Sequence, residues 1–437
     1  FSGPHARRLT LAMPPAPTPT LNLDTVAEKS IEAALAEDFP DAPKKLGKKA
    51  ASQMYHGGAP LSHREQAAAE REQRSKRGGN TEVHVFSQLL TDRHSSASEK
   101  IKAATELGNL ALEDDNKEAI GDAENSLAAL VKLCDKGPTA QGKERAAGAL
   151  RNLAVSSWSN KDAIGKAGGI PPLVALAAAD GTSEAGVDFA VGALASLALD
   201  ADNKRLAAEA GAIPVLVKHV ANGVTAAIQT LAAVGIGNLT SNEMTQPGGR
   251  NNKILVSEAG GIEPLVDLAR CGTTEQREAS VGALWNLAFN DANKKAIAAA
   301  GGIPPLVDLV RAGNARQKEQ AAGALANLTV DPDNRSRVVG AGGIAALVPM
   351  MSGGETERQR SFAHACLSNL AIDSVIKAKI IVTARSGEET ARAQALADAC
   401  RQKLTIGDAE EAPAATEAAA ALADAPAPAA VSAVDVQ

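Results

Sequence analysis

Aromatic residues are scarce in this chain, which has six Phe, two Trp and one Tyr among 437 residues. Alanine is abundant instead, with 91 copies, so the core must be built from Ala, Leu, Val and Ile. Such a composition favours closely packed helices over an all-β sandwich, because strands prefer aromatic and β-branched residues. We therefore expect an all-α protein.

Cysteine and long apolar runs are scarce as well. The chain has four Cys, too few for a disulfide framework. No apolar run approaches the roughly 18 residues that cross a bilayer, and the first twenty residues contain no apolar signal core. These features predict a cytoplasmic protein, with the nucleus or the cytosolic face of an organelle membrane as alternatives.

The formal net charge of −6 is unevenly distributed along the chain. Residues 1–80 carry 12 Lys and Arg against 9 Asp and Glu, whereas residues 405–437 carry six acids and no basic residue. The middle, residues 81–404, is nearly neutral and lacks the basic excess that nucleic-acid binding requires. We predict a flexible, basic N-terminal arm with short helices at 1–80, a folded body at 81–404, and a disordered acidic Ala/Pro-rich tail at 405–437.

A strong internal repeat organises the body. The block Leu-x-Asn-Leu-[Ala/Thr] recurs at spacings of 41 to 48 residues, and two further blocks keep the same phase. In one place, Ser196 stands where the Asn is expected. The Asn positions are Asn109, Asn152, Asn238, Asn286, Asn327 and Asn369.

Each unit is predicted to hold three helices. The Asn of an [Asp/Ser/Ala/Asn]-Asn-[Lys/Arg] block, or the residue before it, is expected to cap a short first helix, as in DDNKEAI and ANKKAI. A Gly pair then permits a sharp bend, and Pro follows in the first turn of the second helix. The third helix ends near the Leu-x-Asn-Leu block and, as in KEQAAGALANLT, places Ala321, Ala322, Leu325 and Leu328 on one apolar stripe. Since three such helices cannot bury their apolar faces alone, the units must stack into a solenoid.

Two stretches carry a family resemblance. GALRNLAVSSWSNKDAIGKAGGIPPLVALA and GALWNLAFNDANKKAIAAAGGIPPLVDLV resemble the armadillo repeats of plant-type and vacuole-associated proteins. The resemblance covers residues 81–404 as seven to eight units, with shortened units at the ends. It implies a right-handed α-solenoid in which the Asn row lines a peptide-binding groove.

No motif predicts catalysis. GPTAQGKE at 137–144 has the spacing of a phosphate-binding loop, but Glu144 replaces the Ser or Thr that would ligate magnesium, and the stretch joins two helices. The seven His are scattered without metal-ligand spacing. We predict no catalytic residue, no metal site, no cofactor and no small-molecule substrate.

The surface of the third helices is the predicted site. The Asn and the residues one and four before it should point away from the apolar stripe. A carboxamide offers a donor and an acceptor, which match the N–H and C=O groups of an extended partner strand. Alternatively, the Asn side chains tie neighbouring helices together. Four units have Gly four residues before the Asn, which suggests that a backbone passes close by: Gly148, Gly192, Gly282 and Gly323.

Specificity is expected from residues around the Asn row. Arg151 and Trp285 directly precede their Asn and offer carboxylate pairing and a flat apolar platform. Acids eight residues before the Asn are predicted to form a groove rim, with which the basic segment 42–80 could pair. These acids are Glu144, Asp188, Glu278 and Glu319.

The sequence therefore predicts a non-enzymatic scaffold or adaptor that binds extended protein segments. One alternative is the substrate-recognition part of a ubiquitin ligase. Another is a vacuole-associated or membrane-associated adaptor, which would reach the membrane only through a lipid anchor outside the residues seen. An importin-α-like transport receptor is disfavoured, because such receptors carry Trp four residues before the Asn, where this chain has Thr105, Gly148, Gly192, Val234, Gly282, Gly323 and Ala365.

Overall fold

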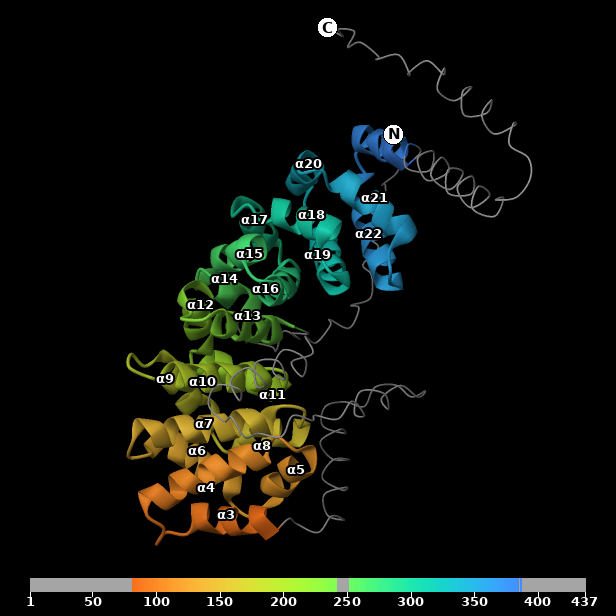
Figure 1. The fold of residues 1–437 in the computed structure, drawn as a ribbon. Coiled ribbons are helices and arrows are strands. Elements are labelled where there is room, and N and C mark those ends of the chain that lie inside the picture. Colours follow the sequence, from red (N-terminus) through yellow and green to blue (C-terminus); the bar gives the residue numbers. More distant parts are fainter. Residues whose placement is uncertain (1–80, 242–250, 385, 387–437) are drawn as a thin grey trace, which may run out of the picture. The chain divides into compact units, whose positions relative to one another are not determined.

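The computed structural model describes residues 81–241, 251–384 and 386. Within these residues the chain forms α-helices joined by short turns, and no strand is found there (Figure 1). The expectation of an all-α fold is confirmed. The predicted arm at 1–80, the tail at 405–437 and most of the shortened last unit lie outside the described residues.

The helices follow the predicted order of three per unit. The first described unit contains two helices, and six complete units follow it (Figure 1). Their bounds are α3 Thr81–Thr91 and α4 Ala97–Leu110; α5 Asp114–Asp122, α6 Ser126–Lys136 and α7 Ala140–Ala154; α8 Trp158–Lys166, α9 Ile170–Ala178 and α10 Glu184–Leu197; α11 Ala201–Glu209, α12 Ala212–Asn222 and α13 Ala226–Thr240; α14 Asn252–Glu258, α15 Ile262–Cys271 and α16 Thr274–Leu287; α17 Asp291–Ala299, α18 Ile303–Ala312 and α19 Ala315–Leu328. The last labelled helices are α20 Pro332–Gly340, α21 Gly343–Gly353 and α22 Glu357–Leu370.

The bends between first and second helices form as the Gly pairs predicted. Gly301 has φ 74°, and the equivalent glycines of four other units have φ between 75° and 80°. This left-handed conformation is costly for residues with a Cβ. Pro follows within the first turn of α9 and α18, where its missing N–H has no helical partner to lose.

The caps of the first helices differ from the prediction in most units, although in α14 Asn251, the residue before the block Asn, caps the helix as predicted. In α17 the N-cap is Asn290, and its side chain accepts from the N–H of Asn293. In α5 the N-cap is Glu113, without a side-chain cap bond. The predicted capping Asn therefore lies inside the first turn in both examples, DDNKEAI and ANKKAI, and its carboxamide is available for another role.

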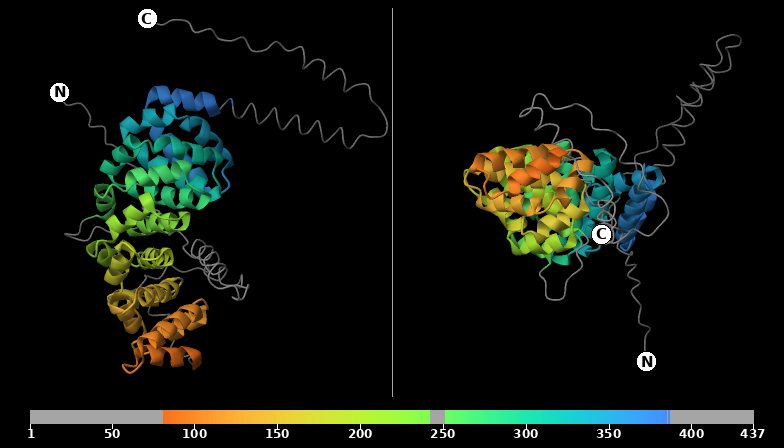
Figure 2. Two further views of the ribbon diagram at one scale, coloured as in Figure 1. Left: turned by 60° about the vertical axis from the view of Figure 1, so that its left-hand side comes forward. Right: turned by 90° about the horizontal axis from the view of Figure 1, so that it is seen from below.

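Equivalent helices of successive units pack on one another in three layers. The third helices form the most closely packed layer, in which α4, α7, α10, α13, α16, α19 and α22 follow in order (Figures 1 and 2). The predicted apolar stripe of α19 is fully buried at Ala321, Ala322, Leu325 and Leu328. The many small residues allow these helices to approach closely, which explains why few aromatic side chains are needed.

Candidate peptide-binding face

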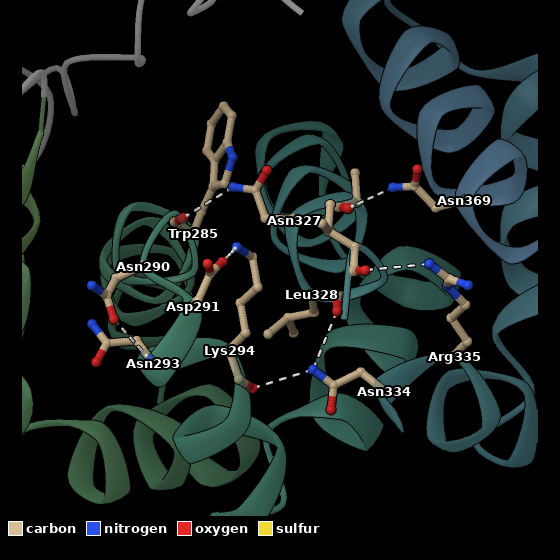
Figure 3. Close-up of polar contacts among 12 residues, drawn as sticks. Trp285, Asn290, Asp291, Asn293, Lys294, Asn327, Leu328, Asn334, Arg335 and Asn369 are labelled. Carbon is tan, nitrogen blue, oxygen red and sulfur yellow. Dashed lines mark hydrogen bonds and ion pairs between the residues drawn. The ribbon is translucent and has the colours of Figure 1, made fainter. Parts of the chain in front are cut away.

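The Asn row of the third helices forms a ladder of hydrogen bonds between units. Each Asn amide nitrogen donates to a carbonyl in the third helix of the preceding unit, always to the residue just before the equivalent row position. The bonds run from Asn152 to Gly108 (2.9 Å), Asn238 to Ala195 (2.9 Å), Asn286 to Gly237 (2.9 Å), Asn327 to Trp285 (3.4 Å) and Asn369 to Ala326 (3.0 Å). Figure 3 shows the Asn327 bond.

The hydrogen-bond pattern at the end of each third helix explains this ladder. In α10 the N–H of Ala198 bonds the carbonyl of Leu194, four residues back, but the N–H of Leu199 bonds Ser196, three residues back. Because the hydrogen-bond spacing changes from four residues to three, no backbone N–H at the end of α10 bonds the carbonyl of Ala195. A helix end must satisfy its last carbonyls from elsewhere, and Asn238 of the next unit supplies the donor.

Ser196, the one departure within the complete units, follows from the same rule. Helix α7 ends differently, because the N–H of Val155 bonds the carbonyl of Arg151 at the regular four-residue spacing. The carbonyl that an Asn at position 196 would serve is therefore already paired. A short Ser at 196 leaves no helix-end carbonyl unsatisfied.

The members of the Asn row differ in how far they are exposed to solvent. Asn238 and Asn286 are 1% and 4% exposed, so the prediction that they point away from packed surfaces is wrong for these two. Asn109, which begins the row, is exposed. With the nitrogen committed internally, each bonded carboxamide keeps its oxygen free of protein donors among the described residues, and the Asn286 oxygen is buried without a partner.

The glycines four residues before the Asn accommodate neighbouring side chains. A Cβ on Gly323 would lie 2.7 Å from Cε2 of Trp285, and one on Gly192 would lie 2.7 Å from Nε of Arg151. Both neighbours come from the preceding unit. The inference that a partner backbone requires glycine at these two positions is therefore wrong, because packing between units already requires it.

Arg151 and Trp285 are therefore buried between units and do not lie on the surface. Their side chains are 2% and 3% exposed. Arg151 forms an ion pair with Asp188 of the next unit. The Trp285 ring meets Phe362 edge-on, with ring centroids 5.1 Å apart. Arg358 lies over the Trp285 ring, 6.0 Å from its centroid. Their predicted contact with a partner stays a prediction.

The four predicted rim acids also connect units. Glu278 pairs with Arg316 (2.9 Å) and Glu319 with Arg358 (3.2 Å). Glu144 accepts from the backbone and the hydroxyl of Ser183, the N-cap of α10. Together with the Asp188 pair, these contacts leave three of the four acids neutralised by arginine, which weakens the case for an acidic rim that attracts the basic segment 42–80.

A second ladder runs along the first helices, which the sequence reasoning missed. The Asn once predicted to cap these helices donates across to the preceding first helix, as in Asn203 to Lys161 (2.8 Å) and Asn293 to Lys253 (2.9 Å). Asn334 bonds both Lys294 and Leu328 (Figure 3). The constant Asn-[Lys/Arg] block was the available signal, because a cap alone accepts several residue types.

Two cysteines, Cys134 of α6 and Cys366 of α22, are buried at separate places in the solenoid. Burial raises the pKa of Cys134 to about 12, and burial also raises that of Cys366 to about 12. Cys366 is fully buried in α22, at the repeat position where other units carry Ala149 and Ala324. Such thiols remain protonated at neutral pH and act as small apolar residues.

Comparison with known proteins agrees with this geometry. The family model for the armadillo/beta-catenin-like repeat matches residues 249–289 and 290–330, two of the units described above. A designed armadillo repeat protein is similar at 26% identity, with a TM-score of 0.50, over 56% of this chain and 99% of its own. The chain carries armadillo repeats. Its fold is an all-α solenoid of such repeats.

Two further solved structures extend this likeness. A computationally designed armadillo repeat protein for modular peptide recognition is 26% identical, with a TM-score of 0.50, over 56% of this chain and 99% of its own. An engineered protein solved by the Northeast Structural Genomics Consortium is 25% identical, with a TM-score of 0.55, over 74% of this chain and 89% of its own. No curated protein matches the chain.

Two other findings concern alternative functions. In the part of the chain that the structure describes, no helix has the length and apolar character needed to span a membrane. No group of three or more potential metal-ligating side chains gathers among residues 81–241, 251–384 and 386.

Proposed function

We propose that these armadillo repeats form a non-enzymatic scaffold that binds an extended polypeptide along the third-helix layer. The observation that carries this proposal is the orientation of the Asn row. Five carboxamides are each fixed by a bond from their nitrogen to the preceding unit, and each keeps its oxygen free of protein donors in the described residues. An extended partner presents backbone N–H groups at a regular spacing that matches such a series of acceptors.

The spacing of the row suits an extended chain. Packed helices lie about 8 to 10 Å apart, and a strand advances about 3.3 Å per residue. One unit therefore corresponds to two or three partner residues, each with a backbone N–H that can donate to an Asn oxygen. Recognition of this kind depends on the backbone, so affinity accumulates over several units and tolerates many sequences.

Three finer assignments rest on the sequence alone. We propose a cytoplasmic adaptor, and the repeats GALRNLA and GALWNLA favour the plant-type or vacuole-associated class. A ubiquitin-ligase role and a lipid-anchored membrane role remain alternatives. Neither is favoured by a contact in the described residues.

The proposal can be tested with a displayed library of random peptides about 12 residues long, which span about four units. We expect the full chain to enrich peptides that bind it in solution. Methylating one backbone nitrogen of such a peptide at a time removes one N–H. We expect affinity to fall at positions two or three residues apart, with little change between them.

An even response to methylation along the peptide would contradict the proposal. So would tight binding by peptides that are helical when bound, because a helix uses its own N–H groups internally. Failure of the full chain to enrich any peptide would also count against it.

A further inference from the structure

Three exposed apolar side chains occupy the same repeat position in the last three complete units. Phe289, Val330 and Ile372 each lie three residues after the row Asn, just beyond the ends of α16, α19 and α22. They are 48%, 54% and 68% exposed. Single exposed apolar residues are common on protein surfaces, but recurrence at one position in three successive units needs a reason. We call these three residues the apolar row.

The ends of the third helices explain why this row faces solvent. The N–H of Phe289 bonds the carbonyl of Asn286, and the N–H of Val330 bonds that of Asn327, each at 3.3 Å and three residues back. Helix α7 ends with the regular four-residue spacing instead, and its equivalent residue, Val155, is 7% exposed. The tight turn that accompanies the Asn ladder therefore also holds Phe289 and Val330 directly beyond their row Asn.

The apolar row is restricted to one end of the solenoid. Leu112 and Leu199 follow the same type of turn in earlier units, but both are half-buried. After α13 the equivalent residue is Ser241, which is 3% exposed. Among the described third helices, α16, α19 and α22 alone are followed by a large apolar side chain that is open to solvent.

The apolar row runs beside the Asn row. Asn327 donates to the Trp285 carbonyl, which joins the ends of α16 and α19 (Figure 3). The Asn369 amide nitrogen lies 3.4 Å from Oγ1 of Thr329, the residue before Val330. Because neighbouring helices pack about 8 to 10 Å apart, the apolar side chains follow one another at about the spacing of the row Asn. A polypeptide along the Asn row would pass within side-chain reach of them.

We propose that the apolar row selects apolar side chains, Leu, Ile, Val or Phe, of the polypeptide bound along α16, α19 and α22. This inference rests on the proposed function and names the partner residues that it prefers. The Asn row recognises a backbone that every sequence has, so it discriminates little between partners. Contact with the apolar row removes apolar surface of both molecules from water, which is favourable when the partner side chain is apolar.

The turns that carry the apolar row are acidic. They contain four Asp and no Lys or Arg, within residues 289–292, 330–333 and 372–375. Two basic residues close to them are engaged by the protein, because Lys294 pairs with Asp291 and Arg335 donates to backbone carbonyls at the end of α19. A partner Asp or Glu next to the apolar contact would meet like charge. We therefore expect the apolar partner residues to lack acidic neighbours.

The test compares selections from the displayed peptide library by the full chain and by its Val330→Ser variant. We expect peptides enriched by the unchanged chain to share apolar positions two or three residues apart, with Asp and Glu depleted beside them. Val330→Ser should abolish the preference at one of these positions and keep the others. Val224→Ser, at a 76% exposed valine just before α13, is the matched control and should change none of them.

A synthetic copy of an enriched peptide then measures the contact itself. Serine at the apolar position that depends on Val330 should weaken binding to the unchanged chain about tenfold, with little effect on binding to Val330→Ser. Because both valines are exposed, both chain variants should keep the melting temperature of the unchanged chain. Additive losses from the peptide and chain substitutions would show that the two side chains do not touch, and the proposal would be wrong.

Three other outcomes would overturn it. Enriched peptides without an apolar preference, or with one that Val330→Ser leaves intact, would refute the role of the apolar row and leave the proposed function standing, whereas enrichment of no peptide would refute both. A lowered melting temperature of Val330→Ser would show that Val330 serves the fold. Self-association of the unchanged chain in sedimentation velocity, lost in Val330→Ser, would show that a second copy covers the row.

Discussion

The hydrogen-bond pattern at the helix ends predicts that Asn238 and Ser196, which occupy equivalent repeat positions, contribute very differently to stability. Asn238 donates to the Ala195 carbonyl at 2.9 Å, and it is 1% exposed. In Asn238→Ala the carbonyl of Ala195, which no backbone N–H bonds, loses its hydrogen-bond donor. Leaving a buried group unpaired costs about 1–3 kcal/mol, and we expect the free energy of unfolding to fall by that amount.

Ser196→Ala should have almost no effect. The carbonyl of Arg151, which the side chain at 196 would otherwise serve, keeps its bond from Val155 at 3.1 Å. We expect a change within about 0.5 kcal/mol, as for substitutions that disturb no packing or buried bond. Ser196→Asn should likewise fail to stabilise the protein, although it restores the repeat consensus.

Urea denaturation of the full chain, followed by circular dichroism, measures both effects. Asn238→Asp serves as a further variant, because it keeps the shape of the side chain but places a carboxylate oxygen against the Ala195 carbonyl. It should destabilise at least as much as Asn238→Ala. Equal losses in Asn238→Ala and Ser196→Ala, or a stabilising Ser196→Asn, would refute the reasoning.

Three further predictions follow from packing and charge. Gly323→Ala should lower the free energy of unfolding by about 1–3 kcal/mol, because its Cβ would lie 2.7 Å from Trp285. Gly340→Ala, whose Cβ would have no atom within 4 Å, should raise the melting temperature. The opposite order of stabilities would contradict the packing of Trp285 on Gly323. The fourth Cys, Cys400, lies outside the described residues and is replaced by Ser in the next experiment. In this Cys400→Ser chain at pH 8, a thiol reagent should label the exposed Cys271 quickly and Cys134 and Cys366 only on unfolding. Because burial raises the pKa of both buried thiols from 9.0 to about 12, the unfolded chain loses these protons first, so their contribution to stability should decline between pH 9 and 12; early labelling of either thiol would contradict this. Arg316→Ala should change stability by less than about 1 kcal/mol in a melting experiment, since its pair with Glu278 is partly exposed; a larger loss would show a packing role.

The three-helix unit could be predicted because its determinants are local. The stripe Ala321, Ala322, Leu325 and Leu328, the Gly pairs and the Pro that follows them each act within a few residues. The repeat spacing then places equivalent residues in equivalent environments, which is why Cys366 is buried like Ala149 and Ala324 at the same repeat position.

The site was harder to predict because its contacts cross between units. Nothing in the sequence around Asn238 shows that the carbonyl of Ala195, 43 residues earlier, is passed over at the end of α10. The same applies to Trp285, which lies over a glycine of the next unit. A side chain that appears to point outward from one helix can be buried by its neighbour, and spacing along the chain contains no information about that choice.

The central claim is that the third-helix Asn row contacts a partner while the first-helix row only joins units. Asn286→Ala and Asn293→Ala form a matched pair, because each loses one buried inter-unit bond of 2.9 Å. The decisive measurement is the dissociation constant of one enriched peptide for both variants of the full chain, with their melting temperatures as the stability control. We predict similar melting temperatures, an affinity at least tenfold weaker for Asn286→Ala, and unchanged affinity for Asn293→Ala. Equal affinity of the two variants would show that both rows only hold the solenoid together.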